Sequence, residues 1–453
     1  MTLRQAAEYV GGRVADKFEN IAFHGVNFDT RRIEAGQLFV ALSGARDGHD
    51  FVPQAMGRGA AAVLASRPLD EDIPAVYVED TTKALQELAR HHRESLHLHC
   101  IGVTGSVGKT TTKEMIASVL CARFRTARTE GNFNNGIGLP VTVLAMDHSR
   151  EAAVLEMGMN HFGEISLLTA IAKPDIAVIT NIGTMHIENL GSREGILRAK
   201  LEILEGLSDH GCAVFCGDDP LLRSVAEEYH AITYGFEEGN AVRALEMREG
   251  EREIEMEVLA FGRPLTLHVP AVGRHNALNA LAALTVGLLC GMQPEEIQQG
   301  LNRFENTGMR QRVYEQDGIR VIADCYNAGP ESMKAAFEVL NKASGRKIAA
   351  LGGMLELGGH APAAHYEVGR LAAATADALF AYGAIHGEYL RGAREAGIAF
   401  AEGYESHEAL AEALRAYLRA GDTLLCKGSR GMRMEKVLEL LFTEKENGGT
   451  NNG

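Results

Sequence analysis

The chain has 453 residues, which is too long for one ordinary hydrophobic core, so we expect two or three domains. Its 46% hydrophobic and 23% charged residues are typical of a soluble globular protein. With 45 basic against 60 acidic residues, the formal charge of −15 disfavours a broad nucleic-acid-binding face. A small anionic ligand is still compatible with this balance, because a glycine loop and one lysine can hold a phosphate locally.

Cysteine usage and the N-terminus indicate a cellular location. The seven cysteines are scattered through apolar segments, without a C-x-x-C pair or a zinc-binding spacing. The two that lie closest together, Cys212 and Cys216, fall in a strand-like run where thiols pack as small hydrophobes. The start of the chain has no apolar signal region, and no apolar span of about 18 residues follows. We therefore expect a cytoplasmic protein with no membrane span.

Residues 1–98 are predicted to form a small α/β domain. Helical spacing covers 3–10, a strand is expected at 37–42, and a helix at 51–59 precedes a strand at 60–65. Two compact polar clusters interrupt these elements. They are the run Asp29-Thr30-Arg31-Arg32 and the glycine-containing loop from Ser43 through Gly44 and Asp47 to His49.

Residues 99–313 alternate strongly between strands and helices. The expected apolar strands are 100–103, 152–157, 175–180 and 212–216, and the expected helices are 109–122 and 193–207. Continuous apolar runs between helices favour a mainly parallel sheet covered on both faces. Residues 241–269 alternate with charge and suggest appended antiparallel strands, before a helix at 276–290.

Residues 314–442 restart the same alternation, which predicts a second doubly wound, Rossmann-like domain. The expected strands are 319–323, 347–352, 377–382 and 422–426, and the expected helices are 331–343, 362–374, 406–419 and 430–442. The polar tail 443–453 is predicted to be disordered. The fold class is therefore α/β with three domains.

The most informative segment is the glycine loop between the strand at 100–103 and the helix that follows it. A loop in this position cradles phosphates with backbone N–H groups and the helix N-terminus. Lys109 is expected to reach the terminal phosphates and the Thr110 hydroxyl to face magnesium. The strict pattern has a glycine where this chain has Val103, so an ordinary turn is the alternative. The candidate phosphate-binding residues are Thr104, Gly105, Ser106, Val107, Gly108, Lys109, Thr110 and Thr111.

Three further candidates follow strands of the same domain. Glu156 closes one strand, His186 follows the next, and Lys200 lies in the helix after that. Ligands of open α/β sheets bind at the carboxyl ends of strands, so the carboxylate and the imidazole could hold a second magnesium or position a substrate. Taken alone, each has a plain alternative: a solvated glutamate, a surface or capping histidine and a helix-surface lysine.

Polar residues also mark the base-binding and third-domain candidates. Asn276 and Asn279 are three apart on one helix face, where amides could read a base edge or simply cap the helix. Asp324 ends a strand and could bind ribose hydroxyls or a metal, or cap the next helix. The turn 427–433 suits an anionic group.

Together these motifs resemble the Mur ligases, the ATP-dependent amide-forming enzymes of peptidoglycan precursor synthesis. The resemblance covers about residues 3–442. It is carried by the phosphate loop 104–111, by Gly273-x-His275-Asn276-x-x-Asn279-Ala280, by 131–140 with Asn134 and Asn135, and by 324–328 and 427–435. The N-terminal clusters fit as well. Two positions depart from the usual family pattern, namely Gly329 in place of an asparagine and Gly353 in place of an aspartate.

The resemblance implies roles for the candidates. Lys109 and Thr110 would hold ATP phosphates and Mg²⁺, with Glu156 and His186 as further metal ligands. Lys200 would be carbamoylated and help to hold the second metal, which makes Lys109, Lys200 and His186 the catalytic set. Asn276 would contact adenine, Arg310 the phosphates and Asp324 the ribose. The UDP-linked substrate would be bound by Asp29, Thr30, Arg31, Ser43, Gly44, Asp47, His49, Asn134 and Asn135.

Within the family, the motifs resemble the branch that joins D-alanyl-D-alanine to a UDP-linked muramoyl tripeptide through an acyl phosphate. The implied domains are 1–98 for the UDP-substrate, 99–313 for ATP and 314–442 for ligation. We expect small-molecule substrates, no nucleic acid or membrane partner, and a monomer. The alternatives are a sibling ligase that adds one amino acid, whose Asp-Asn-Pro-Arg signature is absent here, and a nucleotide-binding switch that makes no bond.

Overall fold

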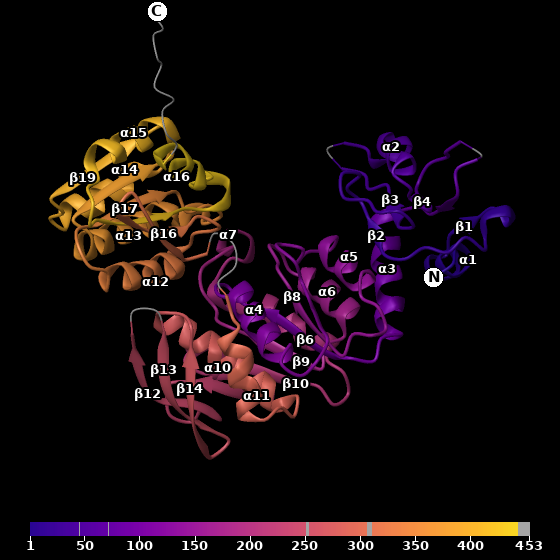
Figure 1. Cartoon of the computed structure of the whole chain (residues 1–453), viewed down its shortest axis with the longest axis horizontal. Helices are drawn as coiled ribbons and strands as arrows, with labels where there is room; N and C mark the ends of the chain where they lie inside the picture. Colours follow the sequence, from indigo (N-terminus) through magenta and orange to yellow (C-terminus); the bar gives the residue numbers. More distant parts are fainter. Residues whose placement is uncertain (45, 71, 251–252, 306–309, 443–453) are drawn as a thin grey trace, which may run out of the picture.

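Three separate β-sheets organise the computed structural model, which describes residues 1–442 except 45, 71, 251–252 and 306–309. The N-terminal sheet and the third sheet lie on opposite sides of the central one (Figure 1). No helix in these described ranges is long and apolar enough to cross a membrane. The tail 443–453, predicted to be disordered, lies outside the described residues.

The N-terminal sheet has five short strands in the order β1-β5-β4-β3-β2, parallel except for the β1–β5 pair. Its strands are β1 (Arg13–Val14), β2 (Val26–Asn27), β3 (Leu38–Val40), β4 (Ala62–Ala65) and β5 (Ala75–Tyr77). Its helices are α1 (Leu3–Val10), α2 (Val52–Gly57) and α3 (Thr81–Glu94). The side chains of β3 and β4 are buried, as expected where helices and loops cover both faces of a sheet.

The central sheet has nine strands in the order β14-β13-β12-β11-β10-β9-β6-β8-β7. All neighbours from β12 to β7 are parallel, while β12, β13 and β14 form the antiparallel extension expected from the alternating charges. Its strands are β6 (His99–Thr104), β7 (Thr126–Arg128), β8 (Ala152–Glu156), β9 (Ile176–Ile179), β10 (Cys212–Cys216), β11 (Ile232–Gly235), β12 (Val242–Glu249), β13 (Ile254–Ala260) and β14 (Arg263–Val269).

The helices of the central unit cover this sheet. They are α4 (Lys109–Leu120), α5 (Gly138–Leu144), α6 (Glu164–Ala172), α7 (Ile187–Leu190), α8 (Arg193–Leu201), α9 (Pro220–Val225), α10 (Arg274–Leu289) and α11 (Pro294–Asn302). The continuous apolar strands β6, β8 and β9 have almost fully buried side chains, which is the burial that a parallel sheet between two helical layers imposes. The carboxyl ends of these three strands face the third sheet (Figure 1).

The third sheet has six strands in the order β15-β16-β20-β17-β18-β19, parallel except for the β15–β16 hairpin. Its strands are β15 (Arg312–Gln316), β16 (Ile319–Asp324), β17 (Lys347–Gly352), β18 (Ala378–Tyr382), β19 (Phe400–Tyr404) and β20 (Thr423–Lys427). Its helices are α12 (Pro330–Asn341), α13 (Ala361–Thr375), α14 (His386–Glu395), α15 (His407–Tyr417) and α16 (Glu435–Phe442). Two apolar clusters, one on each face, form its core.

The predicted fold class, a three-part α/β protein with a central phosphate-loop domain, is confirmed. Each predicted domain contains one sheet, although β15 begins at Arg312, two residues before the predicted start of the third domain. Helix 193–207 is shorter than predicted, because α8 ends at Leu201 and a 3₁₀ turn, Glu202–Gly206, follows.

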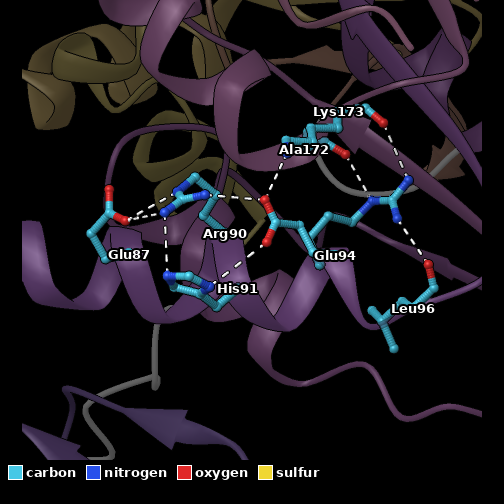
Figure 2. A network of polar contacts seen from close by, with 8 residues as sticks. Glu87, Arg90, His91, Glu94, Leu96, Ala172 and Lys173 are labelled. Atoms are coloured by element: carbon cyan, nitrogen blue, oxygen red, sulfur yellow. Dashed lines mark hydrogen bonds and ion pairs between the residues drawn. The ribbon is translucent and has the colours of Figure 1, made fainter. Parts of the chain in front are cut away.

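The end of α3 fastens the N-terminal domain to the central domain. The buried Arg93 donates to the carbonyl oxygens of Leu96, Ala172 and Lys173 at 3.1, 2.8 and 3.2 Å. A cation at the C-terminus of α6 satisfies carbonyls that have no partner inside the helix and complements the helix dipole. Figure 2 shows the neighbouring ion pairs on α3, in which Arg90 contacts Glu87 and Glu94, and Glu94 reaches Lys173 across the junction.

Substituting Arg93→Met should therefore destabilise the protein by about 2–4 kcal/mol, because it removes three charge-assisted hydrogen bonds at a buried junction. The matched control is Arg90→Met on the same helix. Arg90 lies at the surface, one third exposed, where it pairs with Glu87 and Glu94 within one helix and contacts the His91 ring, so its loss should cost about 1 kcal/mol or less. The measurement is the midpoint of urea unfolding of the full chain. Equal midpoints for the two variants would contradict this account of the junction.

Candidate active site

The phosphate loop connects β6 to α4 in a conformation that requires glycine at two positions. Gly105 has φ +153°, and a Cβ there would lie 1.9 Å from the Thr180 hydroxyl oxygen. Gly108 has φ +84° and begins α4. The loop after β9 clamps this backbone, because the Asn181 side chain accepts from the Val107 N–H at 2.9 Å and donates to the Val107 carbonyl at 2.8 Å. The predicted phosphate loop is therefore formed and rigidly supported.

Lys109 is the first residue of α4 and folds back over the loop. Its ammonium donates to the carbonyl oxygens of Gly105 and Ser106 at 2.7 and 3.3 Å. Burial lowers the pKa of Lys109, the positive charge of Arg310 lowers it less, and the Glu156 carboxylate opposes both. A phosphate group supplies the negative charge that such a partly desolvated cation lacks.

Glu156 is a buried carboxylate whose hydrogen-bond partners are neutral. It is 1% exposed, one oxygen accepts from the Thr110 hydroxyl at 2.7 Å, and the other accepts from the Asn134 amide at 2.8 Å. Its backbone N–H is fixed by the Thr129 hydroxyl at 3.0 Å. A buried carboxylate beside a threonine hydroxyl has the oxygen chemistry that Mg²⁺ prefers. The donor set therefore fits a hard divalent cation.

Replacing Glu156 by glutamine should raise the Mg²⁺ concentration needed for half-maximal nucleotide turnover by about 10-fold or more, since a neutral amide is a poor ligand for this cation. The side chain keeps its size, and its amide can still hydrogen-bond in the same pocket. The measurement is a Mg²⁺ titration of ATP turnover, with Glu164→Gln as a cleft-lining control. The same Mg²⁺ dependence in both variants would contradict a metal role for Glu156.

Lys200 lies on α8 and is 2% exposed. Among the residues that the structure describes, its amine has no hydrogen-bond or ion-pair partner. Burial lowers the pKa of Lys200 well below its ordinary value, and the nearby positive charge of Lys109 lowers it further. A buried primary amine whose pKa is lowered, close to the lysine of the glycine loop, is chemically unusual and differs from an ordinary surface lysine.

His186 faces the third domain and, in the part of the chain that the structure describes, forms no hydrogen bond or ion pair with Glu156. It precedes α7 with φ +64°, and its Nδ1 lies 2.7 Å from the Glu356 carboxylate, in a loop of the third domain where Glu356 also has a positive φ of +62°. The close contact with His186 lowers the pKa of Glu356. Both Glu156 and His186 still line one cleft.

That cleft, of about 540 Å³, is enclosed by the central and third domains and by the linker between them. The phosphate loop, the loops after β8, β9 and β10 and the start of α10 form one wall. Asn276, predicted to read a base, lines it, and the Asn276 amide donates to the Val272 carbonyl at 2.8 Å. Asn279, considered with it, has its amide engaged by Thr112 and Asn276.

The other wall belongs to the third domain. Asp324 at the end of β16 is held by Lys427 at the end of β20, with 2.6 Å between the carboxylate and the ammonium. Arg310 in the linker stacks on the ring of Tyr326, with 3.9 Å from its guanidinium carbon to the ring centroid. The predicted ribose and phosphate residues, Asp324 and Arg310, therefore share the cleft with Lys109 and Asn276.

The N-terminal candidates lie outside this cleft. Asp29 and Arg31 form an ion pair at 2.7 Å that lowers the pKa of Asp29 to about 2. His49 has both ring nitrogens engaged, Nδ1 with Asp47 at 2.6 Å and Nε2 with the Ser66 N–H at 3.0 Å. Thr30 is bonded within the domain, and Ser43 and Gly44 occupy the adjoining loop. By contrast, Asn134 and Asn135 line the cleft.

Several residues of the cleft were not predicted to form part of the site. Thr180 and Asn181 form hydrogen bonds with the phosphate loop. Their position directly after β9, at the carboxyl end of a parallel strand, could have indicated that they belong to the site. Lys427 lies in the turn that was predicted to suit an anionic group, but its pairing with Asp324 was not predicted, and neither was the pairing of Glu356 with His186, because both join separate segments of chain. Local pattern carries no signal for such pairings.

This arrangement defines a class of protein, in which a phosphate-loop domain and a third α/β domain line one cleft. Family models match three segments. "Mur ligase family, catalytic domain" matches 22–93, "Mur ligase middle domain" matches 103–287, and "Mur ligase, glutamate ligase domain" matches 303–430. The chain therefore belongs to the Mur ligase family.

Similar proteins are known from several bacteria. UDP-N-acetylmuramoyl-tripeptide–D-alanyl-D-alanine ligase of Bacillus subtilis is 42% identical, over 97% of this chain and 98% of the relative. The Escherichia coli ligase of that name is 34% identical over 99% of both. MurF from Acinetobacter baumannii superposes with a TM-score of 0.89 at 31% identity, covering 98% of this chain and 99% of that one. MurF from Thermotoga maritima, solved with ADP, gives 0.82 at 31% identity over 92% and 97%.

Proposed function

We propose that this protein is the ATP-dependent ligase that joins D-alanyl-D-alanine to UDP-N-acetylmuramoyl-tripeptide and so completes the pentapeptide precursor of peptidoglycan. The observation that carries the proposal is the match to ligases of this activity over nearly the whole length of both chains, including the B. subtilis relative at 42% identity. The formed phosphate loop and the cleft shared with the third domain supply the machinery. The nucleotide and UDP-linked substrates suit a cytoplasmic location.

The residues divide the work of binding. Lys109, Arg310 and the N–H groups of the phosphate loop would hold the ATP phosphates, and Asn276 and Asp324 the adenosine. The UDP end of the substrate would bind the N-terminal domain through Asp29 and its neighbours. The tripeptide would then extend past Asn134 and Asn135 into the cleft. This division assigns residues 1–98 to the UDP-substrate, 99–313 to ATP and 314–442 to the amino substrate.

Magnesium would be held by Thr110, Glu156 and His186, and when bound it neutralises the phosphates. The buried Glu156, with only neutral hydrogen-bond partners, fits such an ion. His186 would have to release Glu356 of the third domain to join these ligands.

The chemistry has two steps. The terminal carboxylate of the tripeptide attacks the γ-phosphorus of ATP, forming an acyl phosphate while the bond to ADP breaks. The free amine of D-alanyl-D-alanine then attacks the activated carbonyl carbon, inorganic phosphate leaves, and the amine loses its proton. Lys109 stabilises charge on the transferring phosphoryl group, and the other cleft residues position the reactants.

The intermediate must be kept from water, because an acyl phosphate hydrolyses readily. Contacts across the cleft support closure of the third domain as the means. The Thr184 hydroxyl donates to Glu331 at the start of α12 at 3.1 Å, and Lys342 on α12 pairs with Glu249 on β12. These two contacts are polar, as expected of an interface that opens and closes.

Lys200 is the residue that we propose to be carbamoylated. The neutral amine would attack carbon dioxide, form the N–C bond and release a proton, and the resulting carboxylate would contribute to the metal site beside Glu156. The burial of this amine and its lack of an ionic or hydrogen-bond partner among the described residues support the proposal. A charged lysine would gain nothing from such a position.

The test is to incubate the protein with ATP, Mg²⁺ and UDP-muramoyl tripeptide, add each candidate amine separately, and follow phosphate release. We expect release with D-alanyl-D-alanine and none with lysine or diaminopimelate. Release with a single amino acid on a UDP-linked dipeptide precursor, and none with D-alanyl-D-alanine, would assign the protein to a sibling branch. Slow hydrolysis that ignores every peptide substrate would indicate a nucleotide switch.

A further inference from the structure

A chain of buried polar contacts links the phosphate-loop helix to the base-binding helix. The Thr112 hydroxyl on α4 donates to the Asn279 side-chain oxygen at 2.9 Å. The Asn279 amide nitrogen donates to the Asn276 side-chain oxygen at 3.2 Å, and the Asn276 nitrogen donates to the Val272 carbonyl at 2.8 Å. The side chains of Thr112, Asn279 and Asn276 belong to residues that are 0, 7 and 3% exposed.

The direction of this chain is fixed at its Val272 end. A backbone carbonyl only accepts hydrogen bonds, so the Asn276 nitrogen must point at it and the Asn276 oxygen must point away. That oxygen needs a donor, which orients Asn279, and the remaining Asn279 oxygen needs the Thr112 hydroxyl. If the Asn276 amide were flipped, its oxygen would face the Val272 carbonyl oxygen, and if the Asn279 amide were flipped, its oxygen would face the Asn276 oxygen.

The fixed direction gives Asn276 a definite pattern toward a ligand. One N–H and one oxygen lone pair of its amide stay unused, and Asn276 lines the cleft. An asparagine amide pairs with adenine through one donor and one acceptor, using the base's amino group and a ring nitrogen. A 6-oxo purine carries an oxygen where adenine carries the amino group. The oxygen of an Asn276 amide held in this orientation would then face that purine oxygen, and two acceptors form no hydrogen bond.

We propose that Thr112 is a positioning residue for base recognition, which acts through Asn279 to hold the Asn276 amide in the orientation that selects adenine over 6-oxo purines. This inference rests on the proposed function, which assigns the base of ATP to Asn276. Without the hydroxyl, the buried Asn279 oxygen has no donor, so Asn279 is no longer held in place and its contact with the Asn276 amide weakens.

The test compares Thr112→Val, which keeps the branched shape and removes the donor, with Thr112→Ser, which keeps the donor. Affinities of the full chain for ADP, inosine diphosphate and inorganic pyrophosphate are measured by calorimetry in Mg²⁺. We expect Thr112→Val to bind ADP about tenfold more weakly with inosine diphosphate unchanged, so that the preference for ADP falls about tenfold. Thr112→Ser keeps the wild-type preference, and pyrophosphate binds all three proteins equally.

An unchanged preference for ADP in Thr112→Val would overturn the inference. An equal loss for all three ligands would overturn it as well, because that result reports damage to the phosphate loop. Thr112→Ala, which lacks the hydroxyl without the branched shape, gives the same reading should the valine variant fold poorly.

The variant Asn276→Ala tests the role of Thr112 separately from the proposed contact between Asn276 and the base of ATP. If Asn276→Ala retains the preference for ADP, the base does not contact Asn276, and that part of the proposed function fails. If Asn276→Ala loses the preference while Thr112→Val keeps it, the contact of Asn276 with the base stands and only the role of Thr112 is overturned.

Discussion

The variant Lys109→Met should ligate at least about 10²–10³-fold more slowly than the wild type at saturating ATP, because it removes the cation that lies over the phosphate loop. Methionine keeps the length of the side chain and introduces no new charge. Since burial and Arg310 already disfavour the charged ammonium in the free protein, its removal should leave thermal stability equal or slightly raised. The measurements are phosphate release with both substrates and a thermal melt.

Lys109→Arg is the matched control for charge. It keeps a cation but replaces a compact ammonium by a planar guanidinium, so we expect it to recover only part of the lost rate. A wild-type rate in Lys109→Met would contradict the proposed role. A collapse of its melting temperature would instead attribute the loss to the fold.

The architecture was predictable because its strands are continuous apolar runs separated by helices. β6, β8, β9 and β10 could be located in this way, since a strand buried on both faces needs apolar side chains at every position. Two edge strands, β7 and β19, were not predicted. β7 has three residues with an exposed arginine, and β19 carries an exposed Glu402, so neither has an apolar run to reveal it.

The candidate site was predictable where residues follow one another in the chain, and only partly where they meet across it. The phosphate loop needs a local glycine pattern, which the sequence contains. The pairing of Lys427 with Asp324 joins residues 103 positions apart, and that of Glu356 with His186 crosses two domains. No local spacing encodes such contacts. The spacing of Asn276 and Asn279 predicted that they share a helix face. It did not predict that the Asn279 amide forms hydrogen bonds with Thr112 and Asn276 inside the protein.

The two departures from the family pattern differ in their structural consequences. A Cβ at Gly353 would meet Met432 and His365 only at 3.6 and 3.7 Å, which is ordinary contact, so a side chain fits there. At Gly329 a Cβ would lie 2.9 Å from the Met185 side chain, across the boundary between the third and central domains. Glycine at 329 therefore allows Met185 to pack against the start of α12.

The variant Lys200→Met should lose ligation by at least about 10²-fold and yet unfold at a higher temperature than the wild type. The loss follows from the carbamate proposal, since methionine cannot react with carbon dioxide and the metal site then lacks the carboxylate that would accompany Glu156. The higher unfolding temperature follows from the burial of the Lys200 amine. Burial lowers the pKa of Lys200 well below its ordinary value, so at a pH between the two values the unfolded chain binds more protons than the folded chain.

The sign of the pH dependence follows from the same difference. Where the unfolded state binds more protons, stability rises with pH, so the wild type should gain stability between the lowered pKa and the ordinary one. The stability of Lys200→Met should lack this dependence on pH. Its unfolding temperature should exceed that of the wild type most at the low-pH end of this range. The measurement is a series of thermal melts of both proteins at increasing pH up to the ordinary pKa of lysine.

Bicarbonate distinguishes the carbamate from a lysine that acts only by charge. The wild type, assayed in buffer freed of carbon dioxide, should lose activity and regain it when bicarbonate is added, while Lys200→Met should not respond. Lys173→Met, which removes an exposed lysine paired with Glu94, serves as the control and should behave as the wild type. Full activity in Lys200→Met would exclude the carbamate, because no other described residue offers a buried amine without a partner beside Lys109.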